Sequence, residues 1–292
     1  MQVRRSLVVA AAVIVVAAGS AAWVMASASA PAGPLCGQQA RSVAGGAYVV
    51  QNNEFDSTAP MCVVTGDGTS FRVRNSSLSN ATDSFAGAYP SIYQGCHWGR
   101  CSSGGLASKP VMVEALTTGA VTASWSTTVP ASRGSYYVAY DIWFNKTPTT
   151  AGQPDCTELM VWLNHSGPVQ PSGRQIARDV SAGGRTYNIW AGQRPSWDTI
   201  TYDMTTGATS VRGLDIGTLA QDAVSRGYLS RSCYLISVEA GFGLWHGGTG
   251  LATNSFSVDI NATAAAAFPS GQPAFPRKRP LPLELAQYHA GE

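Results

Sequence analysis

The chain has 292 residues, of which 12% are charged, about half the share in a typical globular protein, and 31 are glycine. This composition suits short strands and turns and excludes a long-helix bundle or a coiled coil. The formal net charge is only +2. Nucleic acid is therefore a poor candidate partner, since phosphate binding needs clustered positive charge, and a neutral ligand is favoured.

The first thirty residues indicate an export signal. Arg4 and Arg5 precede an apolar run over 7–18, and 28–30 form a small-residue cleavage site. The alternative is a retained membrane anchor, but a membrane span needs about 20 apolar residues. We expect residues 1–30 to be removed on secretion, leaving a net charge of zero and no membrane attachment.

An Ala/Pro-rich, low-complexity stretch follows Asn261 and predicts a linker or tail over 263–292. The remaining residues, 31–262, are long enough for one domain with a sizeable core.

Short runs of alternating polarity, separated by turn residues, predict an all-β sandwich between these ends. The clearest expected strands are 47–51, 71–74, 121–127, 136–144, 158–164, 185–190, 199–203, 234–244 and 254–260. One helix is expected where Leu219, Ala223 and Val224 share helical spacing, with Thr218 as N-cap and Gly227 as the stop signal.

The expected strand 158–164 has one aliphatic face and one face that carries Glu158, Met160 and Trp162. Because the aliphatic face must be buried, the other face must line water or a groove. In the expected strand that begins at 234, Glu239 and Trp245 likewise lie on the face opposite the apolar side chains.

Asp141 lies on one face of its strand with Tyr137 and Trp143. Carboxylates interleaved with aromatic rings suit a polysaccharide groove, because sugars present apolar faces to the rings and two carboxylates can cleave a glycosidic bond. A single tryptophan, such as Trp143, Trp190 or Trp197, is nevertheless more often part of a core than a ligand contact.

Export makes disulfides the expected state of the six cysteines. Cys96 and Cys101 enclose a short Gly-containing turn and are close enough for a local bridge, and Cys36 and Cys62 flank the first expected strand and could fasten the start of the chain. The other two have no evident partner and are expected to be buried thiols: Cys156 and Cys233.

We expect neither a metal nor a cofactor. The four histidines are scattered without a His-Glu-x-x-His pair, and the sequence has no phosphate-binding loop and no Gly-x-Ser-x-Gly turn.

Several segments together resemble glycoside hydrolase family 12, the small secreted endoglucanases with a β-jelly-roll fold, over about residues 36–261. They are Asn52-Asn53-Glu54-Phe55, Tyr-Asp-Ile-Trp-Phe at 140–144, the strand 158–164, the Pro-containing loop 167–171 and the segment 240–248. The placing of four cysteines is also similar to that in bacterial members with two disulfides.

The resemblance implies a monomeric endo-β-1,4-glucanase that acts on cellulose or a related β-glucan with retention of configuration. It identifies Glu158 as the nucleophile and Asp141 as the acid whose hydrogen bond orients Glu158. Substrate-binding positions implied by it are Asn53, Phe55, Met160, Trp162, Glu239 and Trp245.

One departure from the family pattern concerns the second catalytic carboxylate. Where the family has Ala-Gly-Phe-Glu, with the Glu as acid/base, this chain ends the motif in Gly243. Glycine has no proton to donate, and general acid catalysis contributes roughly 10²- to 10⁴-fold. A smaller departure is Phe55, where the family has tryptophan.

Glu239 is a poor substitute for this acid. It lies four residues before Gly243 on the same strand, roughly 13 Å away, whereas retaining enzymes hold their two carboxyl groups about 5 to 5.5 Å apart. Two functions therefore remain: a weakened endoglucanase, or a carbohydrate-binding pseudoenzyme that has kept the groove.

Overall fold

The computed structural model describes residues 33–130 and 134–261. The expected export signal over 1–30 and the expected tail over 263–292 lie outside these ranges. Within them, no helix has both the length and the apolar character that crossing a membrane would require.

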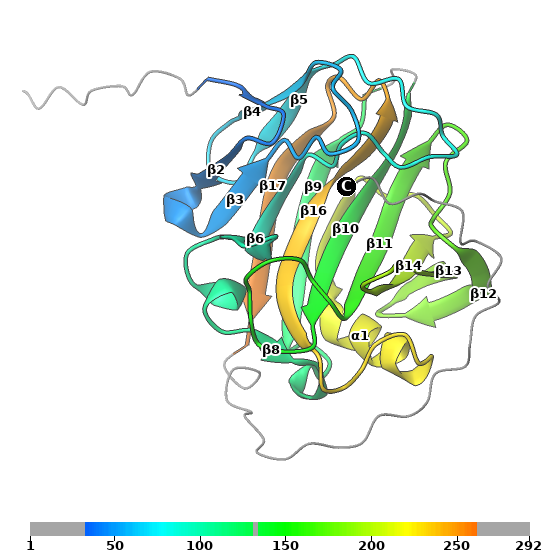
Figure 1. Cartoon of the computed structure of the whole chain (residues 1–292). Coiled ribbons are helices and arrows are strands. Elements are labelled where there is room, and N and C mark those ends of the chain that lie inside the picture. The colour runs from blue at the N-terminus through cyan, green and yellow to red at the C-terminus, as the bar shows by residue number, and fades with distance from the viewer. Residues whose placement is uncertain (1–32, 131–133, 262–292) are drawn as a thin grey trace, which may run out of the picture. The chain divides into compact units, whose positions relative to one another are not determined.

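Two β-sheets make up the described part of the chain (Figure 1). The six-stranded sheet runs in the order β1 (Leu35–Cys36), β4 (Met61–Thr65), β5 (Phe71–Ser76), β17 (Ala252–Ile260), β9 (Val121–Thr128) and β15 (Ser210–Asp215). The eleven-stranded sheet runs in the order β12 (Arg174–Ala182), β13 (Arg185–Gln193), β14 (Asp198–Met204), β11 (Thr157–Ser166), β10 (Ser135–Asn145), β16 (Tyr234–His246), β6 (Ser91–His97), β3 (Tyr48–Gln51) and β2 (Ala40–Val43).

The larger sheet also carries β7 (Arg100–Cys101) beside β6 and β8 (Val111–Met112) beside β16. Three short 3₁₀ turns complete the described elements apart from one helix: η1 (Ala44–Gly46), η2 (Gly105–Ala107) and η3 (Val113–Ala115). Nearly all neighbouring strands pair antiparallel, and β11 pairs with β14 in parallel.

The core lies between the two sheets, so the expected jelly-roll sandwich is confirmed. Phe71 of the smaller sheet meets Phe242 of the larger one with ring centroids 5.9 Å apart. The aliphatic face of β11 is fully buried in this core, as its alternation predicts. Its other face, and those of β10 and β16, are thereby turned away from the core.

All nine expected strands are present, and several further strands have no clear alternation in sequence. The strand β6 is an example, because most of its residues are buried whichever face they lie on. Gly95 also interrupts it at φ +117°, where a Cβ atom would lie 2.1 Å from the Ile236 carbonyl oxygen.

The helix α1 (Ile216–Ser225) forms where expected, but its N-cap is Asp215. The Asp215 carboxylate accepts hydrogen bonds from the Thr218 backbone N–H at 3.0 Å and from the Thr218 hydroxyl at 2.8 Å. Thr218 as N-cap is therefore wrong, since it lies in the first turn. Gly227 follows the helix at φ +81°, as a stop signal requires.

Disulfides join Cys36 to Cys62 and Cys96 to Cys101, as expected. The expectation of two buried thiols is wrong, because Cys156 and Cys233 form a third disulfide. These residues immediately precede β11 and β16, the two strands that flank β10. Their proximity comes from the order of strands in the sheet and not from their spacing in sequence.

Candidate active site

Three adjacent strands, β11, β10 and β16, present the side chains of the candidate site on the face opposite the core. Glu158 lies opposite Trp143 of β10, while Asp141 lies opposite Met160 on one side and Glu239 on the other. The three carboxylates therefore lie on the same face of the sheet, on neighbouring strands.

Glu158 is partly exposed on this face. Its Oε2 atom accepts hydrogen bonds from the Trp197 indole N–H and the Thr199 hydroxyl, both at 3.0 Å. Thr199 is its direct partner across the parallel β11–β14 pair. Burial raises the pKa of Glu158, and the Trp197 hydrogen bond, the Arg194 charge and the Thr199 hydrogen bond oppose this rise.

Asp141 does not make the expected hydrogen bond to Glu158. It is 5% exposed, and its Oδ1 atom has no hydrogen-bond partner in the described part of the chain. Asp141 and Glu158 are diagonal neighbours across the β10–β11 pair. Burial raises the pKa of Asp141 well above its usual value, and the charges of Glu158 and Glu239 raise it further.

Glu239 does not line the groove as expected, since it is fully buried. Its Oε1 atom lies 2.9 Å from His97 Nδ1 and accepts a longer hydrogen bond from the Ser237 hydroxyl. Its Oε2 atom accepts a hydrogen bond of 3.4 Å from the Ser91 hydroxyl. The bridged loop between Cys96 and Cys101 supplies His97. Glu239 is thus a buried, fully partnered group and is unavailable to sugar hydroxyls in this conformation.

Tyr137 fills the space in front of Gly243. The two residues lie opposite each other in the β10–β16 pair. A Cβ atom built on Gly243 would lie 2.1 Å from Tyr137 Cζ and 2.2 Å from Cε1. The phenol ring therefore occupies the position that the side chain of any larger residue at 243 would take.

The other expected aromatic contacts pack around this ring. Tyr137 stacks on Trp162 with ring centroids 4.4 Å apart and planes at 22°, and meets Trp245 edge-on at 5.6 Å. Met160, Trp162 and Trp245 are 6%, 2% and 7% exposed. They form one buried cluster with Tyr137 packed against it, and are largely covered by their neighbours.

Two more tryptophans surround Glu158 and were not singled out as site residues by sequence reasoning. Trp98, in the Cys96–Cys101 loop, is 43% exposed and lies 5.1 Å from Trp143 and 6.3 Å from Trp197, centroid to centroid. The only sequence signal for Trp98 is its place in a short loop closed by two cysteines. Trp197 carries none, because its approach to Glu158 depends on strand pairing.

Arg194 contacts the ring of Phe85, although the two residues belong to segments on opposite sides of β11 and β10. The Arg194 guanidinium carbon lies 4.6 Å from the centre of the Phe85 ring. Arg194 precedes β14, whereas the Phe85 segment is tied to β16, since the indole of Trp245 donates to the Ser84 carbonyl at 2.9 Å. The face over β11 and β10 lies between them.

Asn53 and Phe55 lie on the segment beside the end of β16. The Phe55 N–H donates to the Gly87 carbonyl, and the Gly87 N–H donates to the Leu244 carbonyl. Phe55 is 52% exposed, and Asn53 takes a left-handed conformation at φ +44°.

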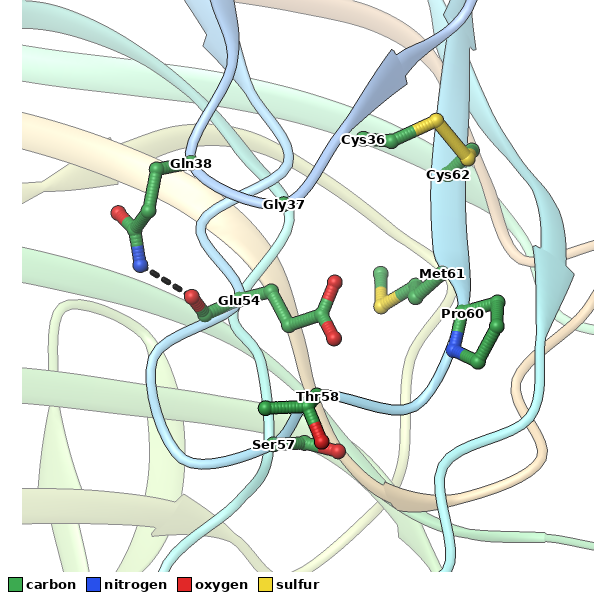
Figure 2. A pocket seen from close by; sticks show the side chains of 9 residues that line it. All are labelled: Cys36, Gly37, Gln38, Glu54, Ser57, Thr58, Pro60, Met61 and Cys62. Carbon is green, nitrogen blue, oxygen red and sulfur yellow. Dashed lines mark hydrogen bonds between the residues drawn. A yellow bond between two sulfur atoms is a disulfide. The ribbon is translucent and has the colours of Figure 1, made fainter.

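Glu54, between these two residues in sequence, lines a pocket of about 560 Å³ (Figure 2). The pocket is lined by the Cys36–Cys62 disulfide and by Met61 and Pro60, and Glu54 is its one charged side chain. Burial raises the pKa of Glu54. The described ranges contain no group of three or more side chains suited to hold a metal ion.

Comparison with known proteins finds relatives of this chain. A sequence profile described as glycosyl hydrolase family 12 matches residues 46–261. The endoglucanase cel12A from Rhodothermus marinus is 39% identical, with 79% of this chain and 99% of that chain covered at a TM-score of 0.72. The probable cellulase Cel12b of Mycobacterium tuberculosis is 30% identical over 128 residues, which cover 44% of this chain and 83% of that protein.

Proposed function

Because the chain belongs to glycosyl hydrolase family 12, a family of glycoside hydrolases, we propose that its cleft binds and hydrolyses a β-1,4-linked glucan. The observation that carries this proposal is the placing of Glu158, a partly exposed carboxylate held by two donors beside tryptophan rings. Such rings suit the apolar faces of a sugar, and the carboxylate suits attack at its anomeric carbon.

In the retaining mechanism, Glu158 forms a bond to the anomeric carbon while the glycosidic oxygen leaves, and water later releases the sugar. Trp197 and Thr199 both donate to Oε2. They fix the carboxylate plane and leave Oε1 as the attacking atom. The charge of Arg194 and these two hydrogen bonds favour the ionised form that attack requires.

We propose that hydrolysis of natural glucans is slow. Gly243 cannot protonate the leaving oxygen, and loss of a general acid costs roughly 10²- to 10⁴-fold in rate. Glu239 does not compensate, since its carboxylate is fully buried against His97.

The second candidate is a carbohydrate-binding protein without hydrolytic activity. The packing of Tyr137 over Gly243 favours it, because this packing has replaced an acid by an aromatic ring of the kind that binds sugars. The two candidates share the cleft and differ only in whether Glu158 reacts.

The test uses 2,4-dinitrophenyl β-cellobioside, whose leaving group needs no proton. We expect a burst of one dinitrophenolate per protein molecule, followed by slow turnover, while barley β-glucan is cut slowly. The variant Glu158→Gln should lose the burst and still bind β-glucan. Binding of β-glucan without any burst in the native protein would instead identify it as a binding protein.

The same proposal places the protein outside the cell as a monomer, with residues 1–30 as the removed export signal, 31–262 as the catalytic domain and 263–292 as a tail. N-terminal sequencing of protein recovered from culture medium should begin near residue 31. Retention of Met1 on membrane-bound protein would contradict this assignment.

A further inference from the structure

We propose that the ring of Tyr137 and a side chain at position 243 compete for the same space. In its present position, the Tyr137 ring therefore excludes a catalytic acid from position 243. This inference rests on the proposed function. It predicts that restoring a carboxylate at 243 does not restore hydrolysis unless Tyr137 is also removed.

The first argument is steric. A Cβ atom at position 243 would approach three ring carbons of Tyr137, with distances of 2.1, 2.2 and 2.7 Å. Carbon atoms in contact normally lie about 3.5 to 4.0 Å apart. Even the first atom of a glutamate side chain therefore overlaps the ring where it stands, so the ring must move before a carboxylate can occupy this place.

The second argument is that the ring is held where it is. Trp162 stacks on it at 4.4 Å and Trp245 meets it edge-on at 5.6 Å, while Tyr89 lies 6.1 Å away. Tyr89 is itself fixed by a hydrogen bond from its hydroxyl to the Ala139 carbonyl at 2.9 Å. Displacement of Tyr137 would uncover Trp162, which is only 2% exposed.

The third argument is that Tyr137 fills the place of an acid without acting as one. Burial raises the pKa of its phenol well above the usual value, and the charges of Asp141 and Glu158 add to this rise. The phenol is therefore a far weaker acid than the carboxyl group whose place it takes. A neutral ring lies opposite position 243, and such a ring can stack on a sugar but is poorly suited to protonate a leaving oxygen.

A carboxyl group at 243 would complete the reaction once space exists. As the Glu158 oxygen bonds to the anomeric carbon, the glycosidic C–O bond breaks and the leaving oxygen takes the proton of the new glutamic acid. Water then gives a proton back to that carboxylate, its oxygen bonds to the anomeric carbon, and Glu158 is released as a carboxylate.

The experiment compares Gly243→Glu, Tyr137→Ala, the double variant Tyr137→Ala/Gly243→Glu, and the matched control Tyr137→Phe/Gly243→Glu. Each is assayed for barley β-glucan hydrolysis, for the dinitrophenolate burst and for thermal stability. We expect the double alanine variant to exceed the native protein by about 10²- to 10⁴-fold on β-glucan. Gly243→Glu alone and the phenylalanine control should show no gain, because both keep a ring in place, and both should melt at lower temperature than the native protein.

A separate measurement does not depend on folding of the double variant. Sodium azide added with 2,4-dinitrophenyl β-cellobioside attacks the glycosyl-enzyme without a base, and we expect Tyr137→Ala to form glycosyl azide at least tenfold faster than the native protein. Restored β-glucan hydrolysis in Gly243→Glu alone, or an equal gain in the phenylalanine control, would overturn the inference. So would a normal burst in the double alanine variant without any gain on β-glucan, which leaves the proposed function standing. Absence of the burst from every variant and from the native protein would overturn the proposed function itself, and this inference with it.

Discussion

The hydrogen bond from Trp197 to Glu158 offers a quantitative test of how Glu158, the proposed nucleophile, is kept ionised. The change Trp197→Phe keeps a ring in place and removes the indole N–H that donates to Oε2 at 3.0 Å. Hydrogen bonds to charged groups contribute about 1.5 to 3 kcal/mol, and one pKa unit corresponds to about 1.4 kcal/mol. The pKa of Glu158 should therefore rise by about 1 to 2 units.

The direction in which the pH–rate profile shifts follows from the role of Glu158. Only the carboxylate attacks, so a higher pKa of Glu158 moves the acid limb of the pH–rate profile to higher pH. On that limb the rate falls by about 10- to 100-fold at fixed pH, while the plateau at higher pH changes little.

The assay is the pH dependence of the dinitrophenolate burst rate with 2,4-dinitrophenyl β-cellobioside. The matched control is Trp98→Phe, since Trp98 lies in the same aromatic cluster but its indole makes no hydrogen bond to Glu158. An acid limb that stays in place in Trp197→Phe, or that moves equally in Trp98→Phe, would refute the role assigned to Trp197.

Three further outcomes are expected. Removal of the third disulfide by Cys156→Ser/Cys233→Ser should lower the free energy of unfolding by about 4.5 kcal/mol, the chain-entropy value for a separation of 77 residues. Urea unfolding measures this change. An unchanged midpoint would show that strand pairing alone holds the starts of β11 and β16 in place. Asp141→Asn should raise the melting temperature at neutral pH and hardly alter it near pH 3. The pKa of Asp141 is raised in the folded protein, so its ionisation costs stability as the pH rises through that pKa. The same gain at both pH values would contradict this. Gly243→Ala should lower the melting temperature in the native background and not in Tyr137→Ala, and calorimetry showing equal losses in both would argue against the overlap with the ring.

The central strands were predictable because each has one buried face. The alternation in β10, β11 and β16 follows from an aliphatic face in the main core and an opposite face that carries carboxylates and aromatic rings. The strand β6 gave no such signal, because it is covered on both faces. The Cys156–Cys233 pair was not predictable either, since only the order of strands brings the two residues together.

Sequence motifs suggested individual site residues but not the contacts between residues on different strands. The proposed roles of Glu158 and of position 243 come from motifs within one strand each. The partners Trp197 and Thr199 depend on the parallel pairing of β11 with β14, and the place of Tyr137 over Gly243 depends on the register of β10 with β16. Sequence periodicity defines the faces of strands but not which strands are neighbours.

The most direct test of the central claim is to trap the glycosyl-enzyme. The native protein is incubated with 2,4-dinitrophenyl 2-deoxy-2-fluoro-β-cellobioside, digested and mapped by mass spectrometry. The account predicts one fluorocellobiosyl group on the peptide that contains Glu158, and none in Glu158→Gln. A folded native protein that binds β-glucan but takes up no label, or that is labelled at Glu54 or Glu239, would contradict it.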